Sequence, residues 1–126
     1  MEMIGKRKNI TVFDDYAHHP TAIKETLKGL RQKYPDNKIV VIVEPHSYSR
    51  TKALLRLYKG VFNNADKVII GPVFKARDKK TFDINGEDIV NNSCHENIIY
   101  LNELDKIIDN IKYNSKKEDV IIVMGA

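Results

Sequence analysis

The sequence predicts an α/β domain built on an open, mostly parallel sheet with helices on both faces. Short apolar runs recur at intervals of roughly 20 to 30 residues, with amphipathic helical patterns between them, which is the rhythm of alternating strands and helices. Some of these runs, such as IVVIV at residues 39–43, are continuously apolar. Such runs are typical of parallel strands that are covered on both faces.

Five strands are expected, one for each apolar run. In chain order they cover residues 10–13, 39–43, 68–70, 98–100 and 120–124. The length of 126 residues suits one domain with a real hydrophobic core, and no linker or internal repeat divides the chain. We therefore expect residues 1–126 to form a single domain.

The first helix is expected directly after the first strand. Pro20 suits the first helical position, His19 is a candidate N-cap, and Pro35 ends the helix. One apolar face, at the spacing i, i+4, i+7 and i+11, is formed by Ile23, Leu27, Leu30 and Tyr34.

Further helices are expected near residues 51–64 and 103–112, because their apolar residues fall on one face. Residues 71–92 are less regular, with a short helix at 87–90. After a strand such as 120–124, a doubly wound domain usually has another helix that covers the sheet. We therefore expect the chain to be a fragment that lacks a last helix.

Composition excludes several classes of protein. A hydrophobic content of 42% with 30% charged residues indicates a globular domain. No apolar run approaches the ~18 residues that a membrane span requires. The net charge is +4, but the lysines are dispersed among acidic residues and form no aromatic-interleaved basic stripe, so we expect no nucleic-acid binding. The single cysteine, Cys94, fits a reducing, cytoplasmic setting.

Three chemically rich loops follow the first three strands. They cover residues 14–20, 44–51 and 71–78, and they contain three of the four histidines and two of the five arginines. The turns that leave parallel strands all lie at the carboxyl edge of the sheet, where open α/β sheets bind ligands. The sequence therefore predicts a ligand-binding site at this edge.

The residue types in these loops favour an anionic ligand. Arg50 and Arg77 offer forked donors that match carboxylate or phosphate groups, and helix N-termini in the first two loops add positive dipole ends. His18 and His19 are neighbours whose side chains diverge, and no zinc spacing is present, so no metal site is expected. The chain has neither a phosphate loop nor a dinucleotide fingerprint. We interpret these loops as half of an active site.

Two of the loops resemble the motifs of a known enzyme family, the Mur ligases. Residues 14–21, DDYAHHPT, resemble the family motif D-D-Y-[GA]-H-H-P-T, and residues 44–51, EPHSYSRT, resemble [QE]-P-H-R-Y-[ST]-R-T. Residues 73–78 are similar to an I-Y-x-A-x-E segment, and 123–126 resemble a strand end that continues into Gly-Asp and a last helix. The match is closest to the C-terminal domain of the member that adds L-alanine to UDP-N-acetylmuramate.

The resemblance implies the Rossmann-like C-terminal domain of a three-domain cytoplasmic enzyme of peptidoglycan synthesis. In that family an N-terminal domain holds the UDP-sugar, and a central domain carries the phosphate loop, ATP and Mg²⁺. ATP activates the carboxylate of UDP-N-acetylmuramate as an acyl phosphate, which the amino group of L-alanine attacks. The domain at residues 1–126 would close over these reactants. Alone it would be inactive and would bind no cofactor tightly.

The resemblance also implies roles for individual residues. Asp15 would contact the ATP ribose or its surroundings, and Tyr16 and His18 would face the amino acid and the acyl phosphate. Arg50 would bind the L-alanine carboxylate or stabilise negative charge in the intermediate, and His46 would line the same pocket. Arg50 and His18 are thus the candidate catalytic residues.

The acceptor substrate and the class of protein remain open at this point. Ser47 stands where the family usually has arginine, which removes a forked donor and leaves the amino acid in question. Residues 17 and 21–23 fit a related ligase that adds murein tripeptide to UDP-N-acetylmuramate, whereas 48–51 fit the L-alanine enzyme. The sequence is also compatible with a free-standing nucleotide- or anion-binding module or with a metal-dependent hydrolase.

Overall fold

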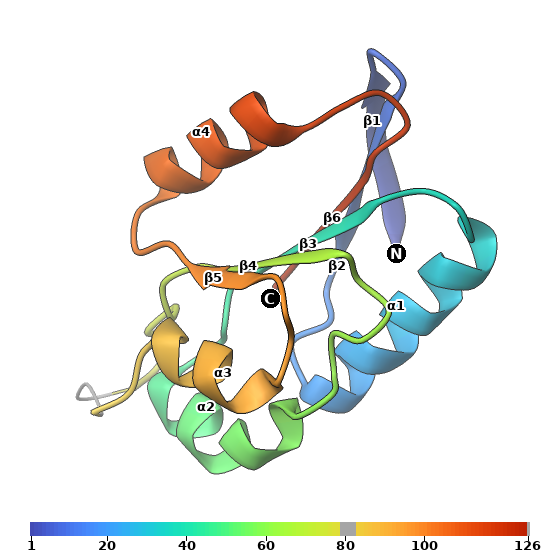
Figure 1. Ribbon diagram of the computed structural model, residues 1–126. Coiled ribbons are helices and arrows are strands. Elements are labelled where there is room, and N and C mark those ends of the chain that lie inside the picture. Colours follow the sequence, from blue (N-terminus) through green and yellow to red (C-terminus); the bar gives the residue numbers. More distant parts are fainter. Residues whose placement is uncertain (79–82, 126) are drawn as a thin grey trace.

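A computed structural model describes residues 1–78 and 83–125. One sheet has the strand order β1-β2-β6-β3-β4-β5 (Figure 1). β1 pairs with β2 in the antiparallel sense, and every other neighbouring pair is parallel. The strands are β1 (Glu2–Arg7), β2 (Ile10–Asp15), β3 (Ile39–Val43), β4 (Lys67–Ile70), β5 (Ile98–Tyr100) and β6 (Val120–Met124).

Helices cover both faces of this sheet. α1, α2 and α3 lie on one face and α4 lies on the other (Figure 1). The open, mostly parallel, Rossmann-like α/β sheet expected from the sequence is thereby confirmed. The helices are α1 (Pro20–Lys33), α2 (Tyr48–Leu54), the 3₁₀ helix η1 (Leu55–Tyr58), α3 (Gly86–Ser93) and α4 (Leu104–Asn114).

All five strands predicted from apolar runs are present, but β1 was not predicted. Every residue of β1 is exposed, so burial leaves no pattern in its sequence. β1 is joined to β2 by the two residues Lys8 and Asn9, which have φ angles of 53° and 60°. Positive φ at both central positions is the geometry of a tight hairpin turn, and the residues that usually form such a turn are Asn-Gly or Asp-Gly. Lys-Asn carries a weaker signal, so the sequence alone does not reveal this hairpin.

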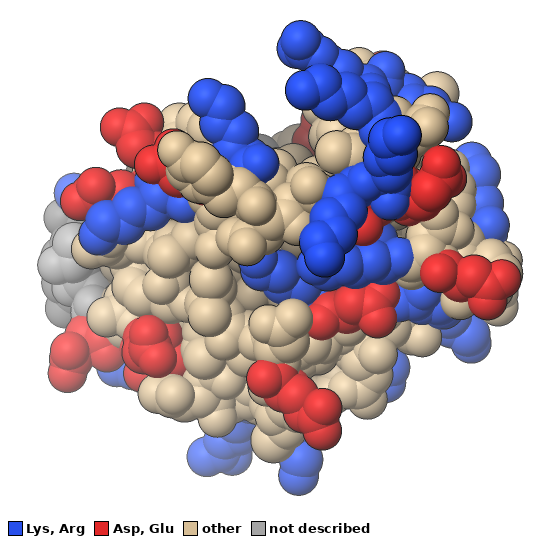
Figure 2. Space-filling model, turned by 45° about the horizontal axis from the view of Figure 1, so that its top comes forward, with Lys and Arg blue, Asp and Glu red and all other residues tan. Residues whose placement is uncertain are grey.

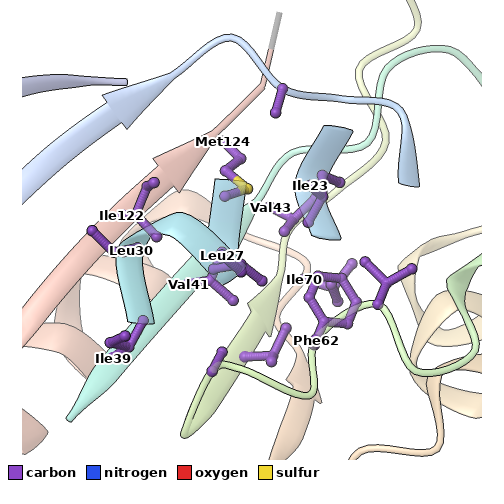
Figure 3. Packing of buried hydrophobic residues seen from close by; sticks show 14 of the residues in the cluster. Ile23, Leu27, Leu30, Ile39, Val41, Val43, Phe62, Ile70, Ile122 and Met124 are labelled. Atoms are coloured by element: carbon purple, nitrogen blue, oxygen red, sulfur yellow. The ribbon is translucent and has the colours of Figure 1, made fainter. Parts of the chain in front are cut away.

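The first helix forms as predicted. His19 is its N-cap, with the Nδ1 atom accepting a hydrogen bond of 3.1 Å from the Thr21 backbone N–H. Pro20 occupies the first turn, and the helix ends one residue before Tyr34 and two before Pro35. The apolar face of α1 packs on the sheet and forms the core together with β3 and β6 (Figure 3). Its fully buried residues are Ile23, Leu27 and Leu30.

The second helix differs from the prediction of a continuous element near residues 51–64. α2 begins earlier, at Tyr48, and the α-helix stops at Leu54, followed only by the single 3₁₀ turn of η1. Gly60 has a φ angle of 76°, a left-handed conformation that a helix interior does not contain. The predicted apolar face is nevertheless used, because Tyr58, Val61 and Phe62 are all buried.

The last two helices are longer than predicted. α3 begins at Gly86, because Asn85 and Asp88 form a capping box in which each side chain accepts a backbone hydrogen bond. Cys94 ends this helix with a φ angle of 58°. α4 extends two residues beyond the expected 112, to Asn114.

An ion pair ties α1 to the starts of β3 and β4. The guanidinium of Arg31 donates to Asp66 Oδ2 at 2.7 Å and to the Asn37 carbonyl at 2.8 Å. The same carboxylate oxygen accepts from the Ile39 backbone N–H at 2.8 Å. Burial alone would raise the pKa of Asp66, but the hydrogen bonds from Ile39 and Arg31 and the charge of Arg31 lower it below its usual range.

Asp66→Asn is expected to lower the free energy of unfolding by about 1–2 kcal/mol near neutral pH, because a charged hydrogen bond becomes a neutral one at a partly exposed site. The pKa of Asp66 is lowered in the folded state. Its stabilising contribution is therefore complete above the unfolded value of about 3.9 and is lost as the pH falls through the folded value. Urea unfolding at several pH values measures this.

The control is Asp109→Asn, which removes an exposed carboxylate on α4. We expect it to leave the stability within about 0.5 kcal/mol of the wild type at every pH. A difference between wild type and Asp66→Asn that persists unchanged below pH ~2 would contradict the assignment.

The face of the sheet that carries α4 has an apolar groove of about 560 Å³. Apolar side chains of the sheet and of α4 line it, among them Val12, Ile42, Ile121, Val123, Leu104 and Ile108. Basic side chains gather toward the β1–β2 hairpin on this face (Figure 2). Arg7, Lys8 and Lys112 line an adjoining hollow there, so lysines and arginines that are dispersed in the sequence meet at one end of the groove.

Candidate functional site

A large hollow lies at the carboxyl ends of the parallel strands. Its volume is about 1120 Å³, and it is formed by the loops after β3 and β4 with the start of α1. Its polar lining consists of His19, His46, Ser47, Ser49, Arg50, Arg77 and Asp78. The hollow thus occupies the edge at which parallel α/β sheets bind ligands.

The loops after β3 and β4 are joined by an extension of the sheet. His46 and Phe74 form an isolated parallel bridge beyond the ends of the two strands. The Ser47 N–H donates to the Phe74 carbonyl at 2.8 Å, and the Phe74 N–H donates to the Pro45 carbonyl at 2.8 Å. Because backbone hydrogen bonds connect them, the two loops leave the sheet as one unit.

Ser47 turns the chain from this bridge into α2. Its φ angle is 63°, which non-glycine residues adopt only in specific settings. Its Oγ accepts from the Arg50 N–H at 3.1 Å, and its carbonyl accepts from the Thr51 hydroxyl at 2.7 Å. Ser47 is therefore the N-cap of α2, a position that favours serine. The cap places Arg50 in the first turn of α2, at the wall of the hollow.

Asp78 binds the N-terminus of α2 from the neighbouring loop. One carboxylate oxygen accepts from the backbone N–H groups of Tyr48 at 2.5 Å and Ser49 at 3.3 Å, and the other accepts from the Ser49 hydroxyl at 2.8 Å. These hydrogen bonds, first that from the Ser49 side chain, hold the pKa of Asp78 below its usual range. The expectation that this helix N-terminus attracts an external anion is corrected, because the chain supplies its own carboxylate.

Asp78→Ala is expected to speed hydrogen exchange at the Tyr48 and Ser49 amides by at least about tenfold, since both lose their acceptor. In acid, the same two amides should lose their hydrogen bonds to Asp78 and exchange faster. Because the pKa of Asp78 is lowered, the anchor is complete above the ordinary value of about 3.9 and is lost as the pH falls through the lowered one. Amide exchange followed by NMR measures both effects.

The matched control is Asp83→Ala, which removes an exposed carboxylate that accepts no hydrogen bond from the described residues. Its exchange rates at Tyr48 and Ser49 should equal those of the wild type. Equal rates in Asp78→Ala as well would show that the carboxylate does not hold α2.

A row of aromatic rings leads from the first loop into the hollow. Tyr16 lies 5.7 Å from His18, His18 lies 5.5 Å from His46, and His46 lies 5.6 Å from Phe74, between ring centroids. The two ends of the row are open to solvent, with Tyr16 74% and Phe74 50% exposed. The row is therefore accessible as a stacking or hydrogen-bonding surface.

The central imidazole of this row has an unused polar atom. His46 Nδ1 is buried and has no hydrogen-bond partner among the residues that the structure describes. A buried polar atom without a partner is costly and uncommon in native proteins.

The structure places the residues expected at the site in three positions. Arg50 and His46 line the hollow. His18 contacts the His46 ring, and Tyr16 contacts His18, both outside the hollow lining. Asp15 is engaged in its own loop, where Oδ1 accepts from the Ala17 N–H at 2.7 Å and Oδ2 lies 3.2 Å from the Met1 amino group.

Sequence reasoning placed Phe74 and Asp78 in the third loop of the site but did not predict their contacts with the second loop. Asp78 and Phe74 join the second and third loops, but no local pattern pairs them with residues about 30 positions away in the chain. Ser47 stands out in the sequence only as a departure from a motif. The serine that begins SYSR, directly before a helix, is a recognisable N-cap signal, and it would have indicated that this side chain serves the helix.

The donors of the hollow fit an anionic ligand rather than a cation. Two arginines and two histidines line it, against the one carboxylate of Asp78, which is already hydrogen-bonded. Within residues 1–78 and 83–125, no group of three or more His, Cys, Asp or Glu residues is placed to hold a metal ion. In the same ranges, no helix has the length and apolar character required to cross a membrane.

Comparisons with known proteins identify the family. The whole chain, residues 1–126, matches the family model described as Mur ligase, glutamate ligase domain. It is 38% identical over 127 residues to the UDP-N-acetylmuramate–L-alanine ligase of Caldanaerobacter subterraneus subsp. tengcongensis, covering 99% of this chain and 27% of that protein. The ligase of the same name from Acetivibrio thermocellus is 43% identical over 129 residues, with 99% and 27% covered.

A solved structure supports the same conclusion. The crystal structure of a murein peptide ligase from Psychrobacter arcticus superposes with a TM-score of 0.79 and 29% identity, over 99% of this chain and 26% of that one. The chain spans about a quarter of the length of the curated relatives that it matches. From the match over its full length, the chain belongs to the Mur ligase family and forms the glutamate ligase domain of that family.

Proposed function

We propose that residues 1–126 form the C-terminal domain of a cytoplasmic, ATP-dependent ligase that joins L-alanine to UDP-N-acetylmuramate in peptidoglycan synthesis. Curated relatives at 38% and 43% identity carry this name. The observation that carries the proposal is the hollow at the carboxyl edge, where Arg50 lies beside His46 with no hydrogen bond from its guanidinium to any described residue. A guanidinium without a protein partner in a hollow is suited to a carboxylate ligand.

The domains that hold UDP-N-acetylmuramate and ATP are proposed to lie elsewhere in a longer polypeptide. The chain spans only about a quarter of its relatives, and its own described residues offer no metal-binding group. The apolar groove beside α4 is proposed to be covered by a further helix of that polypeptide, since large apolar grooves are usually buried.

Arg50 is proposed to bind the carboxylate of L-alanine. A bidentate guanidinium–carboxylate pair fixes both the position and the orientation of the amino acid, so that its amino group faces the activated carboxyl carbon. Holding the nucleophile in this geometry supplies much of the rate enhancement in reactions of this kind. Arg50 would also stabilise negative charge that develops on the tetrahedral intermediate.

His46, His18 and Tyr16 are proposed to complete the acceptor side of the site. His46 would contact the bound reactants, because it forms part of the lining of the hollow. His18 would face the amino acid and the acyl phosphate, held in place by its contacts with the rings of Tyr16 and His46. His18 is also our candidate for handling the proton that the attacking amine releases.

Asp15 is proposed to contact the ATP ribose or its surroundings. Its Oδ1 already accepts from the Ala17 N–H, but an ionised carboxylate has several lone-pair sites and can accept further bonds. Mg²⁺, bound by the central domain, would neutralise charge on the phosphoryl groups. Closure of this domain would expel water that could hydrolyse the acyl phosphate.

A second candidate function is the addition of murein tripeptide to the same sugar nucleotide. The murein peptide ligase of Psychrobacter arcticus shares the fold with a TM-score of 0.79. The hollow of about 1120 Å³ exceeds the ~300–1,000 Å³ of pockets that hold drug-sized ligands. A single alanine fills a small part of such a volume, and a tripeptide fills more of it.

Initial rates with the two acceptors distinguish these functions. The longer polypeptide that contains this domain is incubated with ATP, UDP-N-acetylmuramate and either L-alanine or L-alanyl-γ-D-glutamyl-diaminopimelate, and the product is identified by mass. We expect the L-alanine adduct. The tripeptide adduct instead would support the second candidate, and the absence of both products would reject both. ATP-dependent ligation by the 126-residue chain alone, or tight ATP binding to it, would favour a self-sufficient module.

A further inference from the structure

The loop after β4 brings a second guanidinium to the hollow. Arg77 lines it together with Arg50, from a different loop. Among the residues that the structure describes, neither guanidinium takes part in a hydrogen bond or an ion pair with the protein. We propose that Arg77 is a second anion-binding residue of this site, which binds carboxylate or phosphoryl oxygens of the reactants beside Arg50. This inference rests on the proposed function.

The backbone on both sides of Arg77 is held in place. Ala76, directly before it, has a φ angle of 54°, a left-handed conformation that persists in non-glycine residues only where the surroundings enforce it. Asp78, directly after it, is hydrogen-bonded to Tyr48 and Ser49 at the start of α2. Arg77 is therefore presented from a fixed turn rather than from a free loop.

The charge balance of the hollow leaves Arg77 available. The neighbouring carboxylate of Asp78 is engaged by three donors of α2, and no other Asp or Glu among the described residues lines the hollow. The remaining ionisable lining consists of His19, His46 and the two arginines. Such a concave surface with an excess of cationic groups concentrates anions.

The rest of the lining indicates which anions fit. Ala53, Leu54 and Phe74 add apolar side chains to the lining that contains the two arginines. An amino acid with a small apolar side chain could place its carboxylate on a guanidinium and its side chain on this apolar part of the lining. A phosphoryl group offers the same oxygen geometry to a guanidinium fork, so the shared chemistry is an oxyanion and its source must be separated by experiment.

The first test uses the 126-residue chain and two probes, inorganic phosphate and L-alanine, at low ionic strength. NMR of the arginine Nε–Hε groups reports which side chains respond. We expect saturable shifts at Arg77 and Arg50 with at least one probe, and at least about tenfold weaker binding in Arg77→Ala. Arg56→Ala, which removes an exposed arginine of η1 outside the hollow, should bind within about twofold of the wild type.

Two results of this test would overturn the inference. The first is that the Arg77→Ala variant binds both probes with the affinity of the wild type. The second is that neither probe shifts the Nε–Hε resonance of Arg77. Either result would show that Arg77 binds no anion here. Neither outcome depends on ligase activity, so failure of this inference and failure of the proposed function are measured separately.

The second test identifies the source of the oxyanion, using the longer ligase. If Arg77 binds the amino-acid carboxylate, Arg77→Ala raises the KM for L-alanine with little change in kcat. If it binds phosphoryl oxygens, kcat falls while the KM for L-alanine is unchanged. Arg77→Lys keeps the charge without the fork and should restore part of the loss. If the KM for L-alanine and the kcat of Arg77→Ala both equal those of Arg56→Ala, the inference is overturned.

Discussion

Replacing Arg50 by alanine in the longer ligase is expected to raise the KM for L-alanine by at least about 30-fold. Truncating one partner of a close, hydrogen-bonded charge pair costs about 2–5 kcal/mol, and each 1.4 kcal/mol is a factor of ten. The KM for UDP-N-acetylmuramate should change by less than about twofold, since that substrate is proposed to bind another domain. Steady-state kinetics with each substrate varied in turn measures both values.

Two variants make this prediction specific. Arg50→Lys keeps the positive charge but loses the forked geometry, so we expect an intermediate KM for L-alanine. Arg56→Ala removes an exposed arginine of η1 that does not line the hollow, and its kinetics should match the wild type. An equal rise in the KM values of both substrates in Arg50→Ala would contradict our role for Arg50.

Phe62→Ala is expected to lower the free energy of unfolding by about 3–5 kcal/mol, the usual cost of removing a buried phenylalanine. Phe62 is fully buried, lies beside Ile70 (Figure 3) and belongs to the same core cluster as Leu27 and Val41. Its ring also stacks with Tyr58 at 6.2 Å. Urea unfolding followed by circular dichroism measures the loss.

Phe74→Ala provides the matched control, because the same side chain is removed from a half-exposed position at the hollow. We expect it to change stability by about 0.5 kcal/mol or less while removing the end of the aromatic row, where Phe74 contacts His46. A comparable loss of stability in the two variants would show that the packed core is not where the structure places it.

The sheet could be predicted because its strands carry their own signal. β3 and β6 are buried along nearly their whole length, so each is a continuous apolar run in the sequence. β1 lies at the edge and is exposed throughout, and an exposed strand has no pattern to detect. The helical spacing over residues 51–64 does not form a continuous helix, because Gly60 within it has a left-handed φ angle of 76°, although Tyr58 and Phe62 are still buried.

The location of the candidate site could also be predicted, because parallel strands send all their C-terminal loops to one edge. The contacts between the loops at that edge could not be predicted. Asp78 meets Tyr48 and Ser49 from about 30 residues away, and the bridge between His46 and Phe74 depends on how β3 and β4 pair. Such contacts follow from the assembled sheet and leave no trace in local spacing.

Hydrogen exchange of the longer ligase tests most directly whether the three loops form one ligand-binding surface. The protein is compared with and without a non-hydrolysable ATP analogue, UDP-N-acetylmuramate and L-alanine. We expect protection to increase in residues 14–20, 46–51 and 74–78 together, and not at the opposite edge, in residues 63–66 and 94–97. Protection confined to that opposite edge, or absent from all three loops, would contradict the account.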